Sequence, residues 1–252
     1  MDTFLKQVVI KVIGEESDFA DDTVMTEYPL ILYVNGKEFQ SFFCTPGNLE
    51  ELVVGYLMSC NMLNSKDDIL GLVINEKMNS AKIRLTERSK AIERKPLSES
   101  MVVKIQTIYQ IMKTNLTAST LFKETGGVHS VAIFDKEKPL IILEDVARHN
   151  AVDKIIGYCV LNNIDCSNKI LVVSGRISAS ILSKADKANI PIVLSKSAPT
   201  SLSIERAKAS GITLVGFIRG ERMNIYTHPL RIDLGGDTLR AIVKKMDNLK
   251  KS

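Results

Sequence analysis

The residues best suited to chemistry in this sequence lie in a series of polar, often glycine-containing turns after residue 125, each between apolar segments. Glycine lets a backbone approach a ligand closely, and arginine supplies a planar fork of hydrogen-bond donors. A fold alone does not require His, Arg, Asp and Gly at so many strand ends. We therefore expect these turns to form a pocket for an anionic ligand. They cover residues 125–129, 144–150, 174–176, 197–200 and 219–222.

The first turn contains paired glycines, Gly126 and Gly127, followed by His129. Successive backbone N–H groups at such a pair can form a nest for an anion. A left-handed turn at the end of a helix would also select glycine. That structural interpretation explains the glycines but not His129, so we favour a functional role for the histidine.

The second turn places Arg148 and His149 between a predicted strand and a predicted helix. The alternative to a functional role is a capping cluster, in which Asn150 or Asp145 caps the helix and an Arg–Glu pair forms at helical spacing. Because two of the three histidines in the chain lie beside these turns, we favour a binding role.

The two remaining basic turns leave two interpretations open. The turn at 174–176 follows the most apolar strand and opens a predicted helix, where an anion would meet free N–H groups. Ser174 could also cap that helix without any ligand. Arg219 and Arg222 flank a glycine between two predicted strands, and a plain hairpin explains that segment equally well.

Composition and charge favour an ordinary globular protein. The 252 residues are 45% hydrophobic and 25% charged, which allows a sizeable core in one large domain or two modest ones. The net charge of +4 suits a phosphorylated ligand without implying nucleic acid. No apolar run is long enough to cross a membrane, and the first residues do not resemble a signal peptide. We therefore expect a cytoplasmic protein that binds neither nucleic acid nor membrane.

The four cysteines do not form a C-x-x-C pair, so neither a disulfide framework nor a zinc site is expected. Cys159 lies in an apolar helical stretch and Cys60 ends another, and we expect both to be buried free thiols. Cys166 follows the first of these stretches. Cys44 alone lies outside such helical segments and their flanks.

The N-terminal part reads as a small β-rich domain. We expect a strand over 7–13, an acidic loop over 15–22, and a hairpin of strands 30–34 and 38–44 joined by Asn-Gly. Asn48 is expected to cap the next helix, and two further strands fall within 72–85. A break in periodicity near 94–99 predicts domains over 1–95 and 96–252.

The C-terminal part alternates strands and helices. An apolar stripe predicts a helix from Met101 to Leu116. Such alternation predicts an α/β sheet covered on both faces, with ligands at the strand ends. Strands are expected at 131–134, 140–143, 170–173, 192–194, 213–217 and 223–226, and helices at 151–161, 177–188 and 202–209, the last stopped by Gly211.

Taken together, these segments resemble the FdhD family of formate dehydrogenase accessory sulfurtransferases. The resemblance covers nearly the whole chain in the correct order, although each motif alone is weak. It rests on residues 27–30, 34–36, 44–52, 125–129, 144–154, 174–176, 197–200, 214–217 and 224–229.

The resemblance implies a cytidine-deaminase-like C-terminal α/β domain with a smaller, β-rich α+β N-terminal domain, in a homodimer. It also implies a sulfur carrier that takes a persulfide from a cysteine desulfurase. The sulfur passes to the molybdenum of a bis-molybdopterin guanine dinucleotide cofactor before that cofactor enters formate dehydrogenase. The segment implied to bind this cofactor is Phe217, Ile218, Arg219, Gly220, Glu221 and Arg222. With the turns identified above, the expected site adds Ser174, Gly175, Arg176, Gly126, Gly127, His129, Arg148 and His149.

Zinc-dependent deamination is disfavoured, because the helix starts that hold zinc in true deaminases read His149-Asn150-Ala151 and Ser174-Gly175-Arg176 here, without a cysteine pair. The chain also departs from the family, whose persulfide cysteine lies in a C-x-x-C loop. Residues 81–124 contain no cysteine, and that loop shortens to 95–100.

Either another thiol substitutes for the missing loop, or the protein binds the cofactor without carrying sulfur. A structural, buried thiol is one interpretation of Cys44. Because Cys44 precedes a predicted helix, it is also the thiol to which we expect any persulfide to map. Guanine nucleotides are expected to bind at 174–176 and 219–222.

Overall fold

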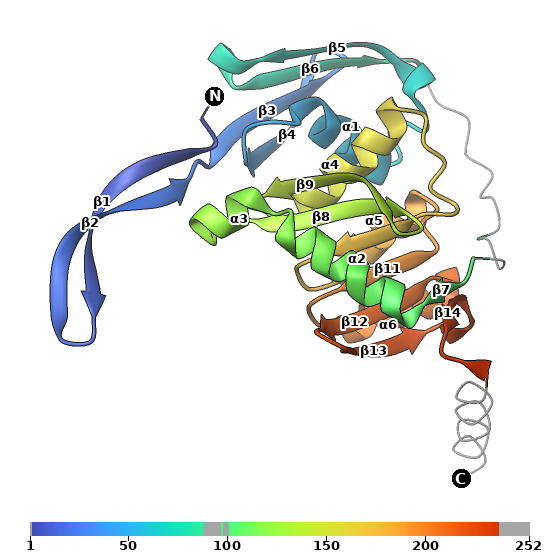
Figure 1. The fold of residues 1–252 in the computed structure, drawn as a ribbon. Helices are drawn as coiled ribbons and strands as arrows, with labels where there is room; N and C mark the ends of the chain where they lie inside the picture. Colours follow the sequence, from blue (N-terminus) through green and yellow to red (C-terminus); the bar gives the residue numbers. More distant parts are fainter. Residues whose placement is uncertain (1, 88–96, 98–100, 237–252) are drawn as a thin grey trace.

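The computed structural model of the protein describes residues 2–87, 97 and 101–236. Its N-terminus forms a hairpin arm that projects from the body (Figure 1). The arm consists of β1 (Phe4–Ile13) and β2 (Glu16–Met25), which pair antiparallel along their whole length. The prediction of an acidic loop over 15–22 is therefore wrong. Ladder pairing with β1 overrides the low strand propensity of the acidic residues there.

A four-stranded sheet follows the arm, with the order β4-β3-β6-β5. The strands are β3 (Tyr28–Val34), β4 (Lys37–Cys44), β5 (Ile69–Asn75) and β6 (Ser80–Leu85). The hairpin expected from Asn35-Gly36 is confirmed, and both residues have the positive φ angles of such a turn. Short 3-10 helices at Lys66–Asp68 and Glu76–Met78 precede and follow β5.

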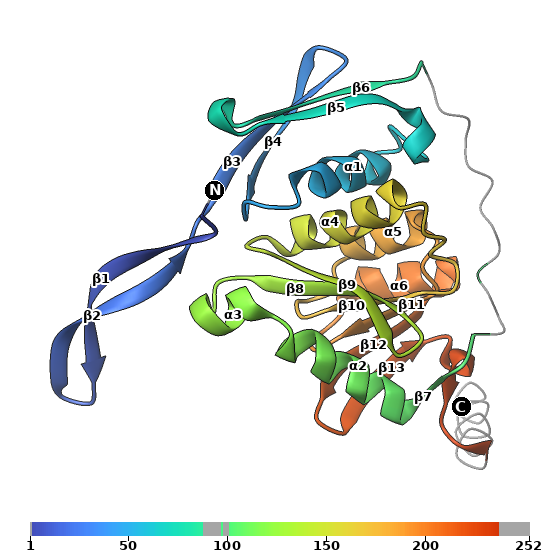
Figure 2. The ribbon, with the colours of Figure 1, turned by 45° about the horizontal axis from the view of Figure 1, so that its top comes forward.

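Helix α1 (Leu49–Ser59) covers one face of this sheet (Figure 2). Leu30 and Leu32 of β3 and Ile83 of β6 point to that face and pack with Leu52 of the helix. Asn48 precedes α1, as expected, but its backbone has a left-handed conformation. Its side chain donates a hydrogen bond to the Glu51 carboxylate instead of capping the helix backbone. The helix therefore begins without a side-chain cap.

The second body is a six-stranded mixed sheet with the order β13-β12-β11-β10-β8-β9. Its strands β10, β11 and β12 are parallel, whereas β8 and β13 run antiparallel to their neighbours in this group. The α/β prediction is confirmed at this level. The strands are β8 (His129–Asp135), β9 (Lys138–Asp145), β10 (Ile170–Val173), β11 (Ile192–Ser195), β12 (Thr213–Arg219) and β13 (Arg222–Thr227).

Helices cover both faces of the six-stranded sheet (Figures 1 and 2). On one face α4 (Arg148–Leu161), α5 (Ala179–Lys187) and α6 (Ser201–Ser210) enclose a core with Val131, Leu171 and Val193. On the other face α2 (Ile105–Thr117) packs on Phe134 and Val172. Gly211 ends α6 in a left-handed conformation, as expected.

Smaller elements complete the second body. The short strands β7 (Val103–Lys104) and β14 (Ile232–Asp233) pair in parallel, and α3 (Thr120–Thr125) precedes β8. Helix α2 begins at Ile105, so Met101 lies before it. The predicted domain boundary falls almost entirely on residues outside the described part. No helix in the described ranges is both long and apolar enough to span a bilayer.

Two helix starts differ from the prediction. Helix α4 begins at Arg148, so Asn150 lies inside it and is not its cap. Helix α5 begins at Ala179, and its cap is Ser178, whose hydroxyl accepts a hydrogen bond from the Ile181 N–H. Ser174 is therefore not a helix cap. The turn after β10 is longer than the apolar pattern indicated.

The two bodies meet in a close crossing of α1 and α4, which we call the α1–α4 seam. A Cβ atom built on Gly55 would lie 1.8 Å from the Asp153 carbonyl oxygen, and one on Gly157 would lie 1.8 Å from that of Glu51. No side chain fits at such distances. The two glycines therefore allow the helix backbones to touch directly.

Candidate functional site

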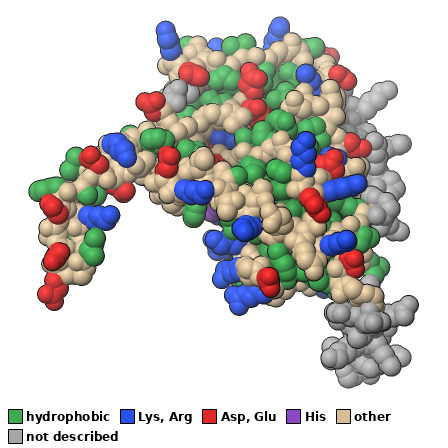
Figure 3. Space-filling model, viewed as in Figure 1, with side chains coloured by type: hydrophobic (Ala, Val, Ile, Leu, Met, Phe, Trp, Pro, Cys, Tyr) green, Lys and Arg blue, Asp and Glu red, His purple; other side chains and the backbone are tan. Residues whose placement is uncertain are grey.

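Sheet topology gathers the polar turns at one edge of the six-stranded sheet. Strands β9, β10, β11 and β12 end at this edge, whereas β8 and β13 begin there. We call it the basic edge, and Figure 3 shows Lys and Arg side chains gathered at the lower left of the body, below the projecting arm. The edge comprises Gly126, Gly127, His129, Arg148, His149, Ser174, Gly175, Arg176, Lys196 and residues 217–222. The prediction that these turns converge is confirmed.

Arg148 lies in the middle of this edge, at the first position of α4. Its Nε atom is buried and has no hydrogen-bond partner among the described residues. The expected pairing with Glu144 is not made, because the Glu144 carboxylate accepts hydrogen bonds from the Leu121 and Phe122 N–H groups at the start of α3. A buried guanidinium N–H without a partner is costly, and an anionic ligand would satisfy it.

Two histidines flank the arginine, and their surroundings lower the pKa of both rings. Burial lowers the pKa of His129, and the nearby Arg148 lowers it further. Burial and Arg148 also lower the pKa of His149, with smaller contributions from Lys184 and His129. The surrounding positive charge opposes protonation of both rings. An anion at the same place would favour it.

The turn after β10 is held by hydroxyl groups on neighbouring strands. The Ser174 hydroxyl accepts from the Ser130 N–H at 3.0 Å, and the Ser197 hydroxyl donates to the Ser174 carbonyl at 2.9 Å. The Ser195 hydroxyl donates to the Gly175 carbonyl at 2.8 Å. Sequence reasoning missed Ser195, whose only signal was a serine at the end of a buried strand. Ser174 thus positions the turn, and the exposed Arg176 can reach a ligand.

Gly175 is packed against the histidine. A Cβ atom on Gly175 would lie 3.1 Å from Nδ1 of His129 and 3.6 Å from Cβ of Arg148. Glycine therefore brings the β10 turn, β8 and α4 together at one point. This contact is the structural reason for glycine at this position.

The segment 217–222 forms the turn between β12 and β13. Phe217 has φ of +53°, a strained conformation for an aromatic residue, within an irregular part of the β12–β13 ladder. The Arg219 guanidinium lies 5.5 Å from the Phe217 ring centre, and its Nε donates to the Lys196 carbonyl. The Tyr109 hydroxyl fixes the Glu221 carbonyl at 2.9 Å. The segment is therefore a hairpin with exposed arginines, and its role in ligand binding stays a prediction.

Other predicted residues have structural roles. Ile218 is buried under α2 in the core, so only its backbone is available to a ligand. Gly126 ends α3 in a left-handed turn, which confirms the structural interpretation of that glycine. The Gly127 N–H donates to the Thr125 hydroxyl at 3.1 Å, so one donor of the expected nest is already used.

A buried ion pair supports the basic edge from beneath. Lys154 Nζ lies 2.7 Å from the Asp145 carboxylate, and both side chains are almost fully inaccessible to solvent. Asp145 also accepts from the Thr45 and Ala147 N–H groups, and Lys154 donates to the Thr45 carbonyl. Asp145 therefore fixes the backbone just before α4, which has no side-chain cap, and joins it to the N-terminal body.

The four cysteines differ in exposure. Cys44 is fully buried, and burial together with the negative charge of Asp145 raises its pKa to about 12. Its thiol donates to the Tyr28 carbonyl, so the structural interpretation of Cys44 is confirmed and its thiol is not placed to receive sulfur. Cys60, expected to be buried, is exposed at the end of α1.

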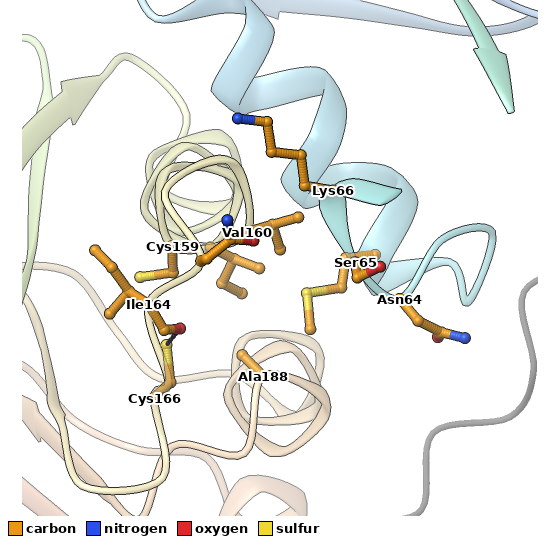
Figure 4. A pocket seen from close by; sticks show the side chains of 11 residues that line it. Asn64, Ser65, Lys66, Cys159, Val160, Ile164, Cys166 and Ala188 are labelled. Atoms are coloured by element: carbon orange, nitrogen blue, oxygen red, sulfur yellow. Dashed lines mark hydrogen bonds between the residues drawn. The ribbon is translucent and has the colours of Figure 1, made fainter. Parts of the chain in front are cut away.

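Cys159 and Cys166 are buried, as expected for Cys159, beside a cavity of about 160 Å³ (Figure 4). The cavity lies between the ends of α1 and α4 and is also lined by Met58 and Lys66. The neighbouring Cys159 thiol and burial raise the pKa of Cys166 well above its usual value. The Cys166 thiol is therefore a poor nucleophile.

Comparison with known proteins places this architecture in one family. A family model described as FdhD/NarQ matches residues 25–101 and 85–233. A sulfur carrier protein FdhD from Bacillus pumilus is 39% identical over 84% of this chain and 90% of its own length. A chain from Desulfotalea psychrophila, described as a formate dehydrogenase accessory protein, matches with a TM-score of 0.82 and 26% identity, over 92% of this chain and all of its own.

One further relative also matches nearly the whole chain. A sulfur carrier protein FdhD from Staphylococcus aureus is 34% identical over 92% of this chain and 97% of its own length. That alignment runs over 258 positions, more than the 252 residues of this chain. The relative therefore has residues that have no counterpart in this chain.

Proposed function

The chain belongs to the FdhD/NarQ family, and on that premise we propose that it serves formate dehydrogenase maturation by binding the molybdenum cofactor at the basic edge. The cargo is the bis-molybdopterin guanine dinucleotide form of the cofactor. Relatives named as sulfur carriers and as a formate dehydrogenase accessory protein support the pathway. The unpartnered Nε of Arg148 is the observation that supports the site.

The residues at the basic edge suit a phosphorylated nucleotide. Arg148, Arg176, Arg219 and Arg222 supply positive charge, and none of them forms an ion pair within the described part of the chain. Arginine binds phosphate oxygens through paired N–H groups, whereas a single lysine acts as a point charge. A site without internal acidic partners keeps this charge for the ligand.

The length of the edge suits a dinucleotide. Strand β12 lies three positions from β8 in the sheet, which separates their ends by roughly 14 Å at about 4.8 Å a strand. We assign the phosphates and guanine of the cofactor to Arg219 and Arg222, and its inner part to Arg148, His129 and His149. The strained backbone at Phe217 supports a binding role, because strain of this kind collects at functional sites.

A genetic test examines the proposed function. Expression of the wild-type protein in a strain that lacks its own accessory protein should restore formate dehydrogenase activity. Arg148→Gln should restore less, whereas Arg206→Gln, an exposed arginine on α6, should restore as much as the wild type. Full activity with Arg148→Gln would show that the basic edge is not the binding site. No activity with the wild type would show that the protein does not serve formate dehydrogenase maturation.

The exposed thiol of Cys60 favours a second function, sulfur carriage. In that step the Cys60 thiolate attacks the outer sulfur of a desulfurase persulfide, and the S–S bond of the desulfurase breaks. The desulfurase cysteine leaves as a thiolate, and Cys60 holds the sulfur as a persulfide. Cys44, Cys159 and Cys166 are buried and cannot meet a partner protein in this way. Cys60 replaces Cys44 as the candidate thiol.

Intact mass after incubation with a cysteine desulfurase and cysteine tests this step. The wild type and Cys44→Ser should each gain one sulfur atom, and Cys60→Ser should gain none. A sulfur that survives Cys60→Ser contradicts the assignment. If a variant without any cysteine still restores formate dehydrogenase activity, the protein acts as a cofactor chaperone that carries no sulfur.

We further propose a cytidine-deaminase-like arrangement of the larger domain, a domain boundary at residue 95 and a cytoplasmic location, and we expect no bound zinc. A cysteine desulfurase and formate dehydrogenase are proposed partners on the same footing.

A further inference from the structure

The end of β4 in the N-terminal body contacts the start of α4 in the other body. Phe43 and Cys44 are the last residues of β4, and Thr45 follows them. The Phe43 carbonyl accepts a hydrogen bond from the side-chain amide of Asn150 at 2.8 Å. Thr45 is only 1% exposed, because the start of α4 covers it. The two bodies are therefore joined here as well as along the α1–α4 seam.

Thr45 uses all three of its polar groups in this contact. Its N–H donates to the Asp145 carboxylate at 3.1 Å, and its carbonyl accepts from Lys154 Nζ at 2.9 Å. Its hydroxyl accepts from the Val146 N–H at 2.9 Å. These three partners lie between the last residue of β9 and the second turn of α4. One residue of the N-terminal body thus holds the short loop that leads into the helix.

The loop held by Thr45 leads directly into Arg148 of the basic edge. Val146 lies two residues before this arginine, and α4 begins at Arg148 without a side-chain cap. A helix start normally relies on a capping side chain to fix its first turn. Here the Ala147 N–H donates to the Asp145 carboxylate, which is itself bonded to Thr45. The direction in which Arg148 leaves the backbone therefore depends on Thr45.

Arg148 needs this external support because no carboxylate holds its side chain. Its Nε is buried without a hydrogen-bond partner among the described residues, and no ion pair there includes it. Such a guanidinium is placed by its own backbone and by packing, here against Gly175. A binding group that is already held in its bound position loses less freedom when the ligand arrives. The backbone at the start of α4 therefore contributes to affinity.

We propose that Thr45 is a positioning residue for the anion site: it fixes the loop before α4 and thereby orients Arg148 toward the ligand. This role rests on the proposed function, in which Arg148 binds the cofactor at the basic edge. The N-terminal body then helps to form a binding site to which it contributes no ligand-binding side chain. Asn150 supports the same contact through the Phe43 carbonyl. A residue that merely joined the two bodies would leave the affinity unchanged.

Calorimetric titration with GDP tests the role of the hydroxyl. Thr45→Val keeps the shape of the side chain but removes the acceptor of the Val146 N–H, and it should weaken binding about threefold to tenfold. Thr45→Ser keeps the hydroxyl and should bind like the wild type. Ser59→Ala, the matched control, removes another hydroxyl hydrogen bond between the same two bodies and should also bind like the wild type. Equal affinity of Thr45→Val and the wild type, or an equal loss in Ser59→Ala, overturns the role given to Thr45.

A double-mutant cycle separates positioning from a general loss of structure. If Thr45 acts through Arg148, Thr45→Val should cost almost no affinity once Arg148→Gln is already present. Additive losses in the double variant overturn the role given to Thr45. A wild type that does not bind GDP contradicts the proposed function instead, and a measurement on the free protein then decides the role of Thr45.

Nitrogen-15 NMR of the free protein is that measurement. The Arg148 Nε–H resonance, identified by its loss in Arg148→Gln, should shift in Thr45→Val and keep its position in Thr45→Ser and Ser59→Ala. Asn150→Ala, which removes the link to the Phe43 carbonyl, should shift it too and serves if Thr45→Val does not fold. Thermal unfolding identifies the folded variants. An Arg148 resonance that stays in place in both Thr45→Val and Asn150→Ala overturns the role given to Thr45, whether or not GDP binds.

Discussion

The α1–α4 seam and the basic edge both contain several charged side chains, but these side chains are paired at the seam and unpaired at the edge. In and beside the seam each buried charge has a partner: Lys154 pairs with Asp145 at 2.7 Å, and Lys184 pairs with Asp153 at 2.6 Å. Asp153 also accepts from the Ser59 hydroxyl of α1. At the basic edge the arginines have no carboxylate partner in the described part of the chain.

Paired buried charges of this kind stabilise the fold, whereas unpaired positive charges are available to bind a ligand. Burial of a charge is tolerated when its partners are complete, and loss of one partner is then expensive. Positive groups gathered without partners raise the energy of the free protein and are relieved by an anion. This comparison gives the seam a structural role and supports the proposed binding role of the edge.

The largest effect is expected from breaking the buried pair beneath the edge. Lys154→Met leaves the Asp145 carboxylate buried without its cation, which should cost about 3–5 kcal/mol of unfolding free energy. Urea denaturation measures it. Asp135→Asn, which removes the exposed partner of Lys169, should cost less than about 1 kcal/mol. Equal losses in both variants would show that burial of the pair does not matter.

At the basic edge, Arg219→Ala and Arg222→Ala should each weaken the binding of GDP, a surrogate for the cofactor, by about 1.5–3 kcal/mol. Both side chains are exposed, so Arg222→Ala should leave stability unchanged, and Arg219→Ala should cost at most about 1 kcal/mol for its hydrogen bond to the Lys196 carbonyl. Calorimetric titration gives the affinity, and thermal unfolding is the control. Unchanged affinity in both variants would remove this segment from the site.

In the seam, Gly157→Ala should lower stability by about 1–3 kcal/mol or more, because its Cβ would meet the Glu51 carbonyl oxygen at 1.8 Å. Gly236→Ala is the matched control, since no atom lies within 4 Å of the added Cβ. Urea denaturation should separate the two variants. Equal stability of the two variants would mean that α1 and α4 can move apart without a loss of unfolding free energy.

The sequence predicted elements set by local patterns and missed those set by distant contacts. Asn35-Gly36 specified a hairpin, and Gly211 specified the end of α6, because each needs only its own backbone geometry. Strand β2 was missed because its acidic residues form a strand only through pairing with β1. The exposure of Cys60 likewise depends on how α1 sits in the tertiary structure, which helical spacing does not reveal.

The candidate site was predictable as a set of turns but not in its details. Alternating strands and helices implied that the turns share an edge. The vacant Nε of Arg148 and the role of Ser195 depend on which residues other turns place nearby. Glu144 illustrates the limit, since its partners belong to α3 instead of to Arg148.

The smallest effect concerns pH. The pKa values of His129 and His149 are lowered in the free protein, and a bound anion should raise them. Binding therefore takes up protons, so affinity for GDP should rise as the pH falls through about 6.5 and level off below the lowered pKa values. Each histidine should contribute less than about tenfold. The double variant His129→Asn, His149→Asn should lose this pH dependence. A wild-type affinity for GDP that decreases as the pH is lowered would contradict the role given to the two histidines.

Calorimetric titration of the wild type and of Arg148→Gln with GDP tests the central claim, that the basic edge holds its charge for a phosphorylated ligand. The wild type should bind GDP, and Arg148→Gln should bind it more weakly by about 1.5–3 kcal/mol. Arg206→Gln, on the exposed surface of α6, should match the wild type. No binding by the wild type, or equal affinity in wild type and Arg148→Gln, would contradict the claim.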